Sequence, residues 1–388
     1  MLTGLTSLAW FVRGGHHALI NDEVDYDTLA MNWLHSGAGM SMDGKHPSAT
    51  VGPVYPAFLA GVYAVFGHNP RIVYVVQIFF AVLAAYIFYL IGERLTGSRL
   101  LSTLSAGLFG LYFPLLNYTT LLLTELMFAL LLAITVYLTL TAFQKKSLAW
   151  FFLSGIVAGI TALCRPSVMP MPVLVLVVSL FAFHGQKRLI AGSAVLFAVG
   201  AALAITPWTV RNYLVFRSFV PVATEGGYVF WAGNYGKHGD YGNFVRGDKP
   251  PAHIQRFEDT NPSEVERNAF YTREAIKIIE HNPGHAAALA GRKFLRLWFS
   301  VGYRDPPSRS SLALALGHLI LLGLAVYSIK VVKNRPGLLF VWLVLLNFTA
   351  IHMITFGNVR YALPIMPYVI ILAVSGFARF VPQLANAE

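Results

Sequence analysis

The chain has 388 residues, of which 56% are hydrophobic and only 12% are charged. A soluble domain usually carries about a quarter charged residues, and the long uncharged runs exclude an ordinary soluble protein. The formal net charge of +11 would suggest a nucleic-acid partner in a soluble protein. Here the basic residues are sorted along predicted membrane segments, so no nucleic acid is expected. The single cysteine, Cys164, excludes an internal disulfide.

Nine apolar runs are long enough, or nearly so, to cross a bilayer as helices of about 20 residues. Residues 1–12 are uncharged but too few to cross; either residues 14–20 complete a first span or that span is abbreviated. The sequence thus predicts an all-α polytopic membrane protein with about 9–10 transmembrane helices. The nine runs are residues 72–92, 100–124, 126–143, 147–164, 166–186, 189–210, 310–329, 336–359 and 361–378.

Lys and Arg in short loops mark the cytoplasmic side of a membrane protein. The basic short loops near residues 94–99, 145–146, 187–188, 330–335 and 379 share one side when the spans alternate. Nearly all acidic residues then lie on the other side. We expect a multi-pass protein of the inner (plasma) membrane, with the endoplasmic reticulum as the alternative. The predicted regions are an N-terminal transmembrane module (1–210) with a first extracytoplasmic loop (about 21–56), an extracytoplasmic insert (211–309), and C-terminal transmembrane helices (310–388).

The first outer loop begins with a dense group of acids, in the sequence NDEVDYDTLAMNW from Asn21. At 100° per residue, an apolar stripe falls within about 80° of Asp22. The pattern predicts an amphipathic interfacial helix with Asn21 as its N-cap, Asp22 aimed into the protein, and Asp25 and Asp27 able to face water. Alternatively, the four acids only cap and solubilise this helix. The stripe consists of Tyr26, Leu29, Ala30 and Trp33.

The insert contains two predicted helices. Asn261-Pro262-Ser263 precedes a helix that runs through His281, with Glu264 and Glu266 in a first turn that suits negative charge. The sequence His281-Asn282-Pro283-Gly284 ends it. A second helix is expected over residues 285–300.

Several charges fall where burial makes them costly, and a charge within a span usually faces a wet cavity or a partner. Glu125 is expected about two turns inside a span, and Arg165, Arg211 and Arg360 lie at outer ends of spans. Alternatively, the glutamate bonds a neighbouring span and the arginines extend to headgroups. Carboxylates beside guanidinium groups suit transfer from a phosphate donor. Since no nucleotide-binding motif is visible, a donor reached from the outer face would be lipid-borne.

Six stretches, in this order and on this side of the membrane, carry a family resemblance. The chain resembles the C-type (GT-C) superfamily of polytopic glycosyltransferases, in the branch of dolichyl-phosphate-mannose protein mannosyltransferases and bacterial aminoarabinose (lipid A) transferases. The stretches are Asn21-Asp22-Glu23-Val24-Asp25-Tyr26, Lys45-His46-Pro47 with Gly52-Pro53-Val54-Tyr55-Pro56, Leu123-Thr124-Glu125-Leu126, Cys164-Arg165-Pro166, Pro207-Trp208-Thr209-Val210-Arg211-Asn212-Tyr213, and Arg360-Tyr361-Ala362-Leu363-Pro364.

The resemblance implies inverting transfer of a sugar from a polyprenyl-phosphate carrier to a hydroxyl of a lipid, glycan or protein. It implies Asp22 as the general base, with Glu23 and Glu125 as further catalytic residues. No cofactor is predicted beyond a divalent metal, for which His46 and Glu125 are the candidate ligands. The alternatives are a transporter or flippase of lipid-linked sugars and a non-catalytic subunit of the same fold. The implied substrate- or phosphate-binding residues are Tyr26, Lys45, His46, Tyr55, Arg165, Arg211, Arg360 and Tyr361.

Overall fold

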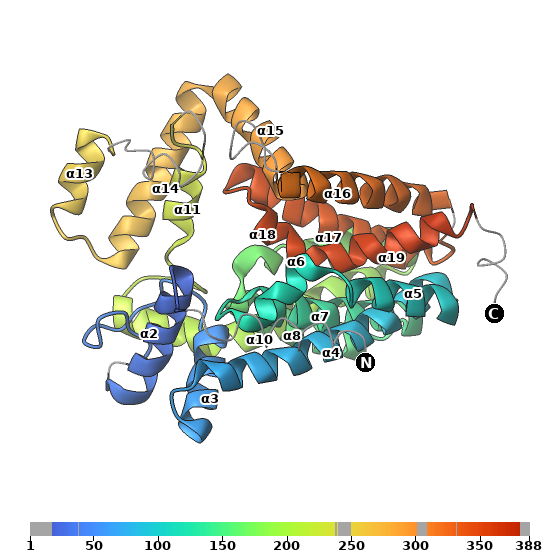
Figure 1. Cartoon of the computed structure of the whole chain (residues 1–388), viewed down its shortest axis with the longest axis horizontal. Helices are drawn as coiled ribbons and strands as arrows, with labels where there is room; N and C mark the ends of the chain where they lie inside the picture. Colours follow the sequence, from blue (N-terminus) through green and yellow to red (C-terminus); the bar gives the residue numbers. More distant parts are fainter. Residues whose placement is uncertain are drawn as a thin grey trace.

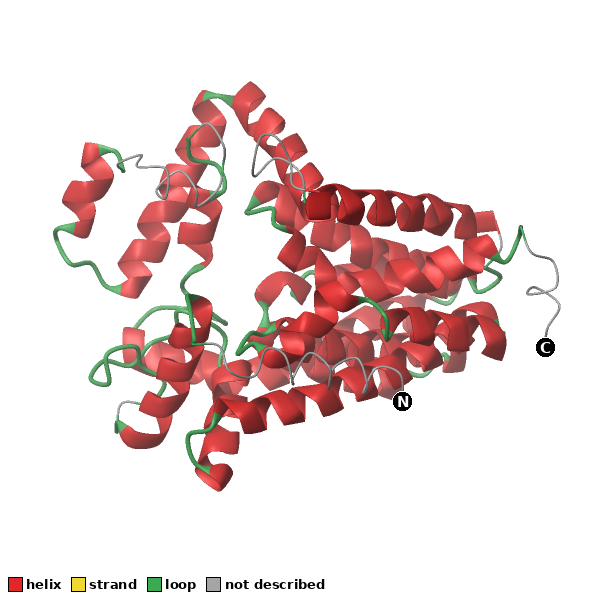
Figure 2. Ribbon diagram, in the orientation of Figure 1, coloured by secondary structure: helices red, strands yellow, loops and turns green. Residues whose placement is uncertain are grey.

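The computed structural model describes residues 18–37, 39–236, 239, 250–300, 309–330 and 332–380. Within these ranges every regular element is a helix and no strand occurs (Figure 2). The all-α expectation is therefore confirmed. Its physical reason is that a membrane-spanning backbone must satisfy its polar groups within its own helix. The tenth predicted crossing falls on residues 1–17, outside the described ranges.

Each of the nine predicted runs contains a helix. In the described part of the chain, six helices are long and apolar enough to cross a membrane, or seven if one bent pair counts as a span; α8 and α9 are shorter. The elements are α4 (Pro70–Thr96), α5 (Arg99–Phe109), α6 (Phe113–Leu116), η1 (Asn117–Thr120), α7 (Glu125–Lys145), α8 (Leu148–Cys164), η2 (Pro166–Val168), α9 (Met171–Ala182), α10 (Lys187–Phe216), α16 (Arg309–Tyr327), η3 (Ser328–Lys330), α17 (Arg335–Ile354), α18 (Val359–Ala362), η4 (Leu363–Ile365) and α19 (Met366–Phe377).

The run predicted over residues 100–124 is broken. Helix α5 ends near Gly110, and the α6–η1 segment continues at an angle of 53° to it. Pro114 explains the break, because it has no backbone N–H to donate to the turn before it, whereas in the first turn of α6 that donor is not needed. Residues 121–124 are non-helical, and α7 begins at Glu125. Glu125 therefore stands at the first residue of its helix, and the expected position two turns inside a span is wrong.

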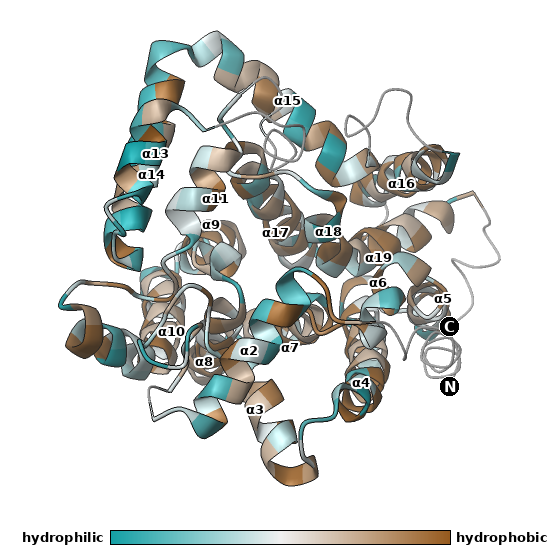
Figure 3. Ribbon diagram, turned by 60° about the vertical axis from the view of Figure 1, so that its left-hand side comes forward, coloured by the Kyte–Doolittle hydropathy of each residue, from teal (hydrophilic) through white to brown (hydrophobic). Residues whose placement is uncertain are grey.

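The basic loops at one end of the bundle lie together. The amide of Asn334 donates to the carbonyl of Arg94 at 3.1 Å, and the Arg94 guanidinium donates to Tyr137 and Gln144. Figure 1 shows a further group of helices at the opposite end, which we call the polar end, and Figure 3 shows α14 as mainly hydrophilic beside a mostly hydrophobic bundle. These helices are α2 (Asp22–His35), α3 (Val54–Phe66), α11 (Gly226–Ala232), α13 (Ala252–Glu258), α14 (Glu264–His281) and α15 (Pro283–Phe299).

Both predicted helices of the insert are confirmed as α14 and α15. Helix α14 starts with a capping box, in which the Ser263 and Glu266 side chains each bond the other's backbone N–H. Trp231 of α11 and Tyr271 of α14 form a small core with Ile254 of α13. Helix α10 continues to Phe216, past the predicted start of the insert at residue 211; the division into three regions stays a prediction.

Candidate functional site

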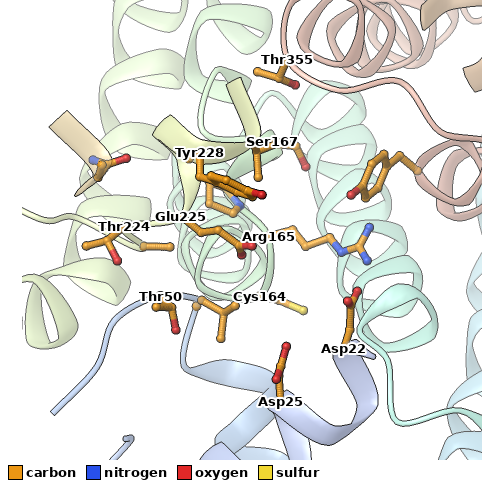
Figure 4. A pocket seen from close by; sticks show the side chains of 18 of the residues that line it. Asp22, Asp25, Thr50, Cys164, Arg165, Ser167, Thr224, Glu225, Tyr228 and Thr355 are labelled. Carbon is orange, nitrogen blue, oxygen red and sulfur yellow. The ribbon is translucent and has the colours of Figure 1, made fainter. Parts of the chain in front are cut away.

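A cavity of about 1040 Å³ lies at the polar end of the bundle (Figure 4). Its walls come from α2, the loop at residues 50–52, the C-terminal end of α8, the segment 223–229, helix α14, and the junction of α17 with α18. Its volume is at the upper end of that of ordinary ligand pockets. The charged residues that line it are Asp22, Asp25, Arg165, Glu225, Glu258, Glu264, Arg267 and Arg360.

Three residues behind and along one wall form what we call the Glu125 clamp: Glu125, Arg165 and Arg360. The Glu125 side chain is fully buried, and its Oε1 accepts from Arg165 Nη2 at 2.7 Å and from Arg360 Nε. Arg165 Nε also donates to the hydroxyl of Thr124 at 2.7 Å. The second carboxylate oxygen, Oε2, is buried and has no hydrogen-bond partner among the described residues. A buried polar atom without a partner is rare in folded proteins and calls for an explanation.

The non-helical stretch before α7 places Glu125, and two buried polar side chains hold it. The backbone N–H of Leu122 donates to Glu23 Oε1 at 2.9 Å. The amide of Gln77 donates to the carbonyls of Thr119 and Leu121 at 3.1 and 2.9 Å. Backbone groups freed from a helix in apolar surroundings need such partners. Glu23 and Gln77 thus support the clamp from behind, and neither lines the described cavity wall.

Asp22 lies at the cavity, on the first turn of α2. Its Oδ2 accepts from Arg360 Nη1 at 2.6 Å, and its side chain is 53% exposed. The acid of this helix that points into the protein core is instead Glu23, which is 2% exposed. Asn21 occupies the predicted N-cap position, but its φ is 50° and its side chain makes no capping hydrogen bond. Asp27 accepts from the Tyr63 hydroxyl at 2.7 Å.

Two carboxylates in the cavity are unpaired in the described part of the chain: Asp25 of α2 and Glu225, which precedes α11. Figure 4 shows both directed into the space that Asp22 and Arg165 also face. The pKa of Glu225 is raised to about 7, chiefly by desolvation in the cavity and further by the negative charges of Asp22 and Asp25. The positive charge of Arg360 acts in the opposite direction and lowers it. Desolvation and Asp22 also raise the pKa of Asp25. Sequence analysis missed Glu225, which has no apolar periodicity around it.

Two predicted aromatic residues complete the wall beside the clamp. Tyr361 stacks on His352 with ring centroids 4.6 Å apart, and the Arg165 guanidinium lies 5.5 Å from the Tyr361 ring. Tyr26 lines the cavity and packs edge-on against Tyr55 at 5.1 Å. Aromatic faces beside a cation hold its guanidinium plane in one orientation.

Four predicted binding residues do not line the described cavity. Lys45 is exposed, and His46 is 83% exposed and bonds Asp43 at 2.6 Å. Tyr55 is buried and donates to Gln77 at 3.0 Å. Arg211 donates to the carbonyl of Ser48 at 3.0 Å and stacks on Trp208, so it holds the loop that leads to the cavity.

The residues considered for a divalent metal do not fit one. His46 is paired with Asp43 on the surface, while Glu125 sits between two guanidinium groups that repel a cation. Across the described ranges, no three His, Cys, Asp or Glu side chains gather as metal ligands would. We derive no catalytic step through a metal.

Known proteins resemble the chain in sequence and in fold. Residues 45–210 match the family model described as dolichyl-phosphate-mannose-protein mannosyltransferase. The archaeal oligosaccharyltransferase AglB from Archaeoglobus fulgidus, in complex with an inhibitory peptide and a dolichol-phosphate, matches with a TM-score of 0.61 and 13% identity. That match covers 98% of this chain and 50% of AglB. The same oligosaccharyltransferase with zinc and sulfate matches at 0.58 and 15% identity, over 99% of this chain and 49% of that one.

The chain thus spans about half the length of these oligosaccharyltransferases. ArnT from Cupriavidus metallidurans, bound to undecaprenyl phosphate, matches at a TM-score of 0.44 and 16% identity, over 98% of this chain and 79% of that one; it is too distant to support an argument. No curated protein sequence matches.

At these identities the solved structures establish the fold alone, and no residue role carries over from them. The family match lies in the membrane module, and the shared fold extends over almost the whole chain. The chain therefore shares the fold of these oligosaccharyltransferases, and its residues 45–210 resemble the dolichyl-phosphate-mannose-protein mannosyltransferase family.

Proposed function

We propose that the chain transfers a sugar, with inversion, from a polyprenyl-phosphate-linked donor to an acceptor hydroxyl, on the extracytoplasmic side of the inner membrane. The observation that carries the proposal is the cavity itself, which has guanidinium groups on one wall and carboxylates opposite, at one end of an apolar bundle. An oligosaccharyltransferase of the same fold has been solved with a dolichol-phosphate bound, which supports a lipid-linked donor.

Arg360 and Arg165 are the proposed site for the donor phosphate. Guanidinium groups match phosphate oxygens in charge and geometry, and they stabilise the negative charge that develops as the phosphate leaves. Both side chains line the cavity while bonded to the buried Glu125. The carboxylate holds the two like charges together, so the phosphate meets a fixed pair.

The acceptor hydroxyl needs a base, because its oxygen is a weak nucleophile until its proton is removed. Asp22 is the base that the sequence predicts. Besides the buried Glu125, it is one of two carboxylates near Arg360, and both line the cavity; Glu225 is the other. The insert covers the cavity from above with Tyr228, Asn268 and Arg267. We propose that this wall receives a lipid, glycan or protein acceptor.

The test is transfer by the purified protein in nanodiscs. Radiolabelled undecaprenyl-phosphate hexoses and pentoses are supplied with an envelope lipid and glycan extract, and product and released undecaprenyl phosphate are measured. Arg360→Gln should raise the donor KM by about 10- to 100-fold, the loss expected for one charged hydrogen bond. The variant should still fold, because Glu125 keeps Arg165 as its partner.

Arg211→Gln is the matched control, since Arg211 lies near the same end of the bundle but does not line the described cavity. It should leave the donor KM within about twofold. Movement of the labelled lipid across the bilayer without product would instead favour a flippase. Failure of every donor to react or to bind would reject the proposal.

A further inference from the structure

Three carboxylates face the cavity near the clamp, and their surroundings differ. Asp22 is bonded to Arg360 at 2.6 Å. Asp25 and Glu225 have no ion-pair or hydrogen-bond partner for their side chains in the described chain. A carboxylate held by a guanidinium is stabilised as an anion, which makes it a weaker base. A free carboxylate in a partly dry cavity takes a proton more readily.

We propose that Glu225 is the general base that accepts the proton of the acceptor hydroxyl, while Asp22 holds Arg360 in place for the donor phosphate. The inference rests on the proposed glycosyl transfer and deepens it. As the acceptor oxygen bonds the anomeric carbon, its proton passes to a Glu225 carboxylate oxygen. The bond from the anomeric carbon to the phosphate oxygen breaks, and its electron pair leaves on the polyprenyl phosphate facing Arg360.

The backbone around Glu225 is fixed, as a base requires. The N–H groups of Thr224 and Glu225 donate to the carbonyls of Ala49 and Thr50, at 2.9 and 3.2 Å. The Ala49 N–H in turn donates to Glu264 Oε1 of α14 at 2.8 Å. The loop at residues 48–50 and helix α14 therefore hold Glu225 from two sides.

The next turn adds a further constraint. The N–H of Gly227 donates to Asn268 Oδ1 at 2.7 Å, and a Cβ on Gly227 would lie 2.1 Å from the Asn268 carbonyl oxygen. Only glycine permits this close approach. Gly227 thus lets α11 pack onto α14 while the Glu225 side chain is directed into the cavity (Figure 4).

The charges around Glu225 favour it over Asp25. The charge of Arg360, the proposed phosphate ligand, shifts the pKa of Glu225, as do the charges of Asp22 and Asp25. For Asp25, the charged neighbour that shifts the pKa is Asp22. Glu225 therefore responds to the charge of the proposed phosphate ligand. A pKa of about 7 also matches a base that works at neutral pH. The titratable groups that share its surroundings are Asp22, Asp25, Tyr26, Tyr228, Arg360 and Tyr361.

The test is the pH dependence of kcat/KM for undecaprenyl-phosphate-sugar transfer in wild type and four variants. A base must be deprotonated, so wild-type kcat/KM should rise with pH through about 7. Glu225→Gln should lower kcat by about 10²- to 10⁴-fold and remove this rise. Glu225→Asp should keep the rise at reduced kcat, which a merely structural role would not produce.

Asp25→Asn is the matched control, because it makes the same chemical change in the same cavity. It removes a negative charge that raises the pKa of Glu225, so the rise should move to lower pH while kcat stays within about threefold. If Glu225→Gln keeps both its rate and the rise, and Asp22→Asn loses them, Asp22 is the base and this inference is wrong. Inactivity of the wild type with every donor would instead reject the proposed function.

Discussion

The two walls of the cavity differ in whether their carboxylates are paired with a cation. On the wall nearest the bundle, Glu125 is fully buried and both arginines of the clamp are bonded to it. On the wall formed by the insert, Glu225 faces the cavity without a partner for its carboxylate in the described residues. An unpaired ion is too costly in a dry interior, whereas cavity water makes a free carboxylate tolerable and leaves it able to titrate.

This difference suggests that the two walls have different roles in the reaction. The clamp keeps its charge fixed, which suits the binding of a phosphate whose charge grows during the reaction. The insert wall can change its protonation state, which suits proton transfer. If the comparison is right, substitutions in the clamp should act mainly on stability and donor binding, and substitutions at Glu225 mainly on rate and its pH dependence.

The largest expected effect comes from Glu125→Ala, which leaves Arg165 and Arg360 facing each other without their shared anion. Breaking a buried ion pair by removing one partner usually costs about 3–5 kcal/mol. The thermal unfolding temperature in one detergent should therefore fall well below that of Arg360→Gln, which retains a one-to-one pair. Equal unfolding temperatures for Glu125→Ala and wild type would show that the clamp does not need its anion.

A second prediction concerns Gly52, in the loop that pairs with the backbone beside Glu225. A Cβ at Gly52 would lie 2.1 Å from the carbonyl oxygen of Leu163. This is a backbone atom, so no change of side-chain rotamer can relieve the clash. Gly52→Ala should cost about 1–3 kcal/mol and displace the loop from the C-terminal end of α8. Gly61→Ala is the control, because its Cβ would meet no atom within 4 Å. Matching unfolding temperatures for the two variants would contradict the close approach.

A third prediction tests how the two walls are joined. The buried ammonium of Lys293, in α15, donates to Asn234 of the insert and to the carbonyls of Ile354 and Thr355, just before the turn that carries Arg360. Desolvation and the charge of Arg296 lower the pKa of Lys293 to about 8. Between pH 8 and about 10 the unfolded chain then binds more protons than the folded one, so stability should rise with pH.

The rise should be on the order of 1 kcal/mol after screening by solvent. The measurement is the unfolding temperature across this pH range in wild type and in Lys293→Met, which has no group to titrate at that position. A slope that survives in Lys293→Met would assign the effect to other groups.

The sequence predicted the helices and the gathering of carboxylates and arginines well, and it predicted individual positions less well. Uncharged runs identify spans because lipid forbids unpaired charge, and the arginines of the clamp stood out for the same reason. Helical periodicity could not decide whether Asp22 or Glu23 points into the protein, because it does not show which neighbouring segment covers a helix. Here the segment before α7 covers the Glu23 side of α2, where the N–H of Leu122 donates to Glu23. Glu225 lies in a loop with no periodic signal, and its importance comes from a tertiary crossing with residues 49–50.

The smallest expected effects lie at Lys45 and His46, where sequence and structure differ most. Both are exposed and neither lines the described cavity, so Lys45→Ala and His46→Ala should each change stability by less than about 0.5 kcal/mol. The donor KM should stay within about twofold of wild type, in contrast to Arg360→Gln. An increase for Lys45→Ala as large as that for Arg360→Gln would mean that the loop at residues 43–46 closes over the donor phosphate. In that case the clamp would supply only part of the positive charge that holds the donor.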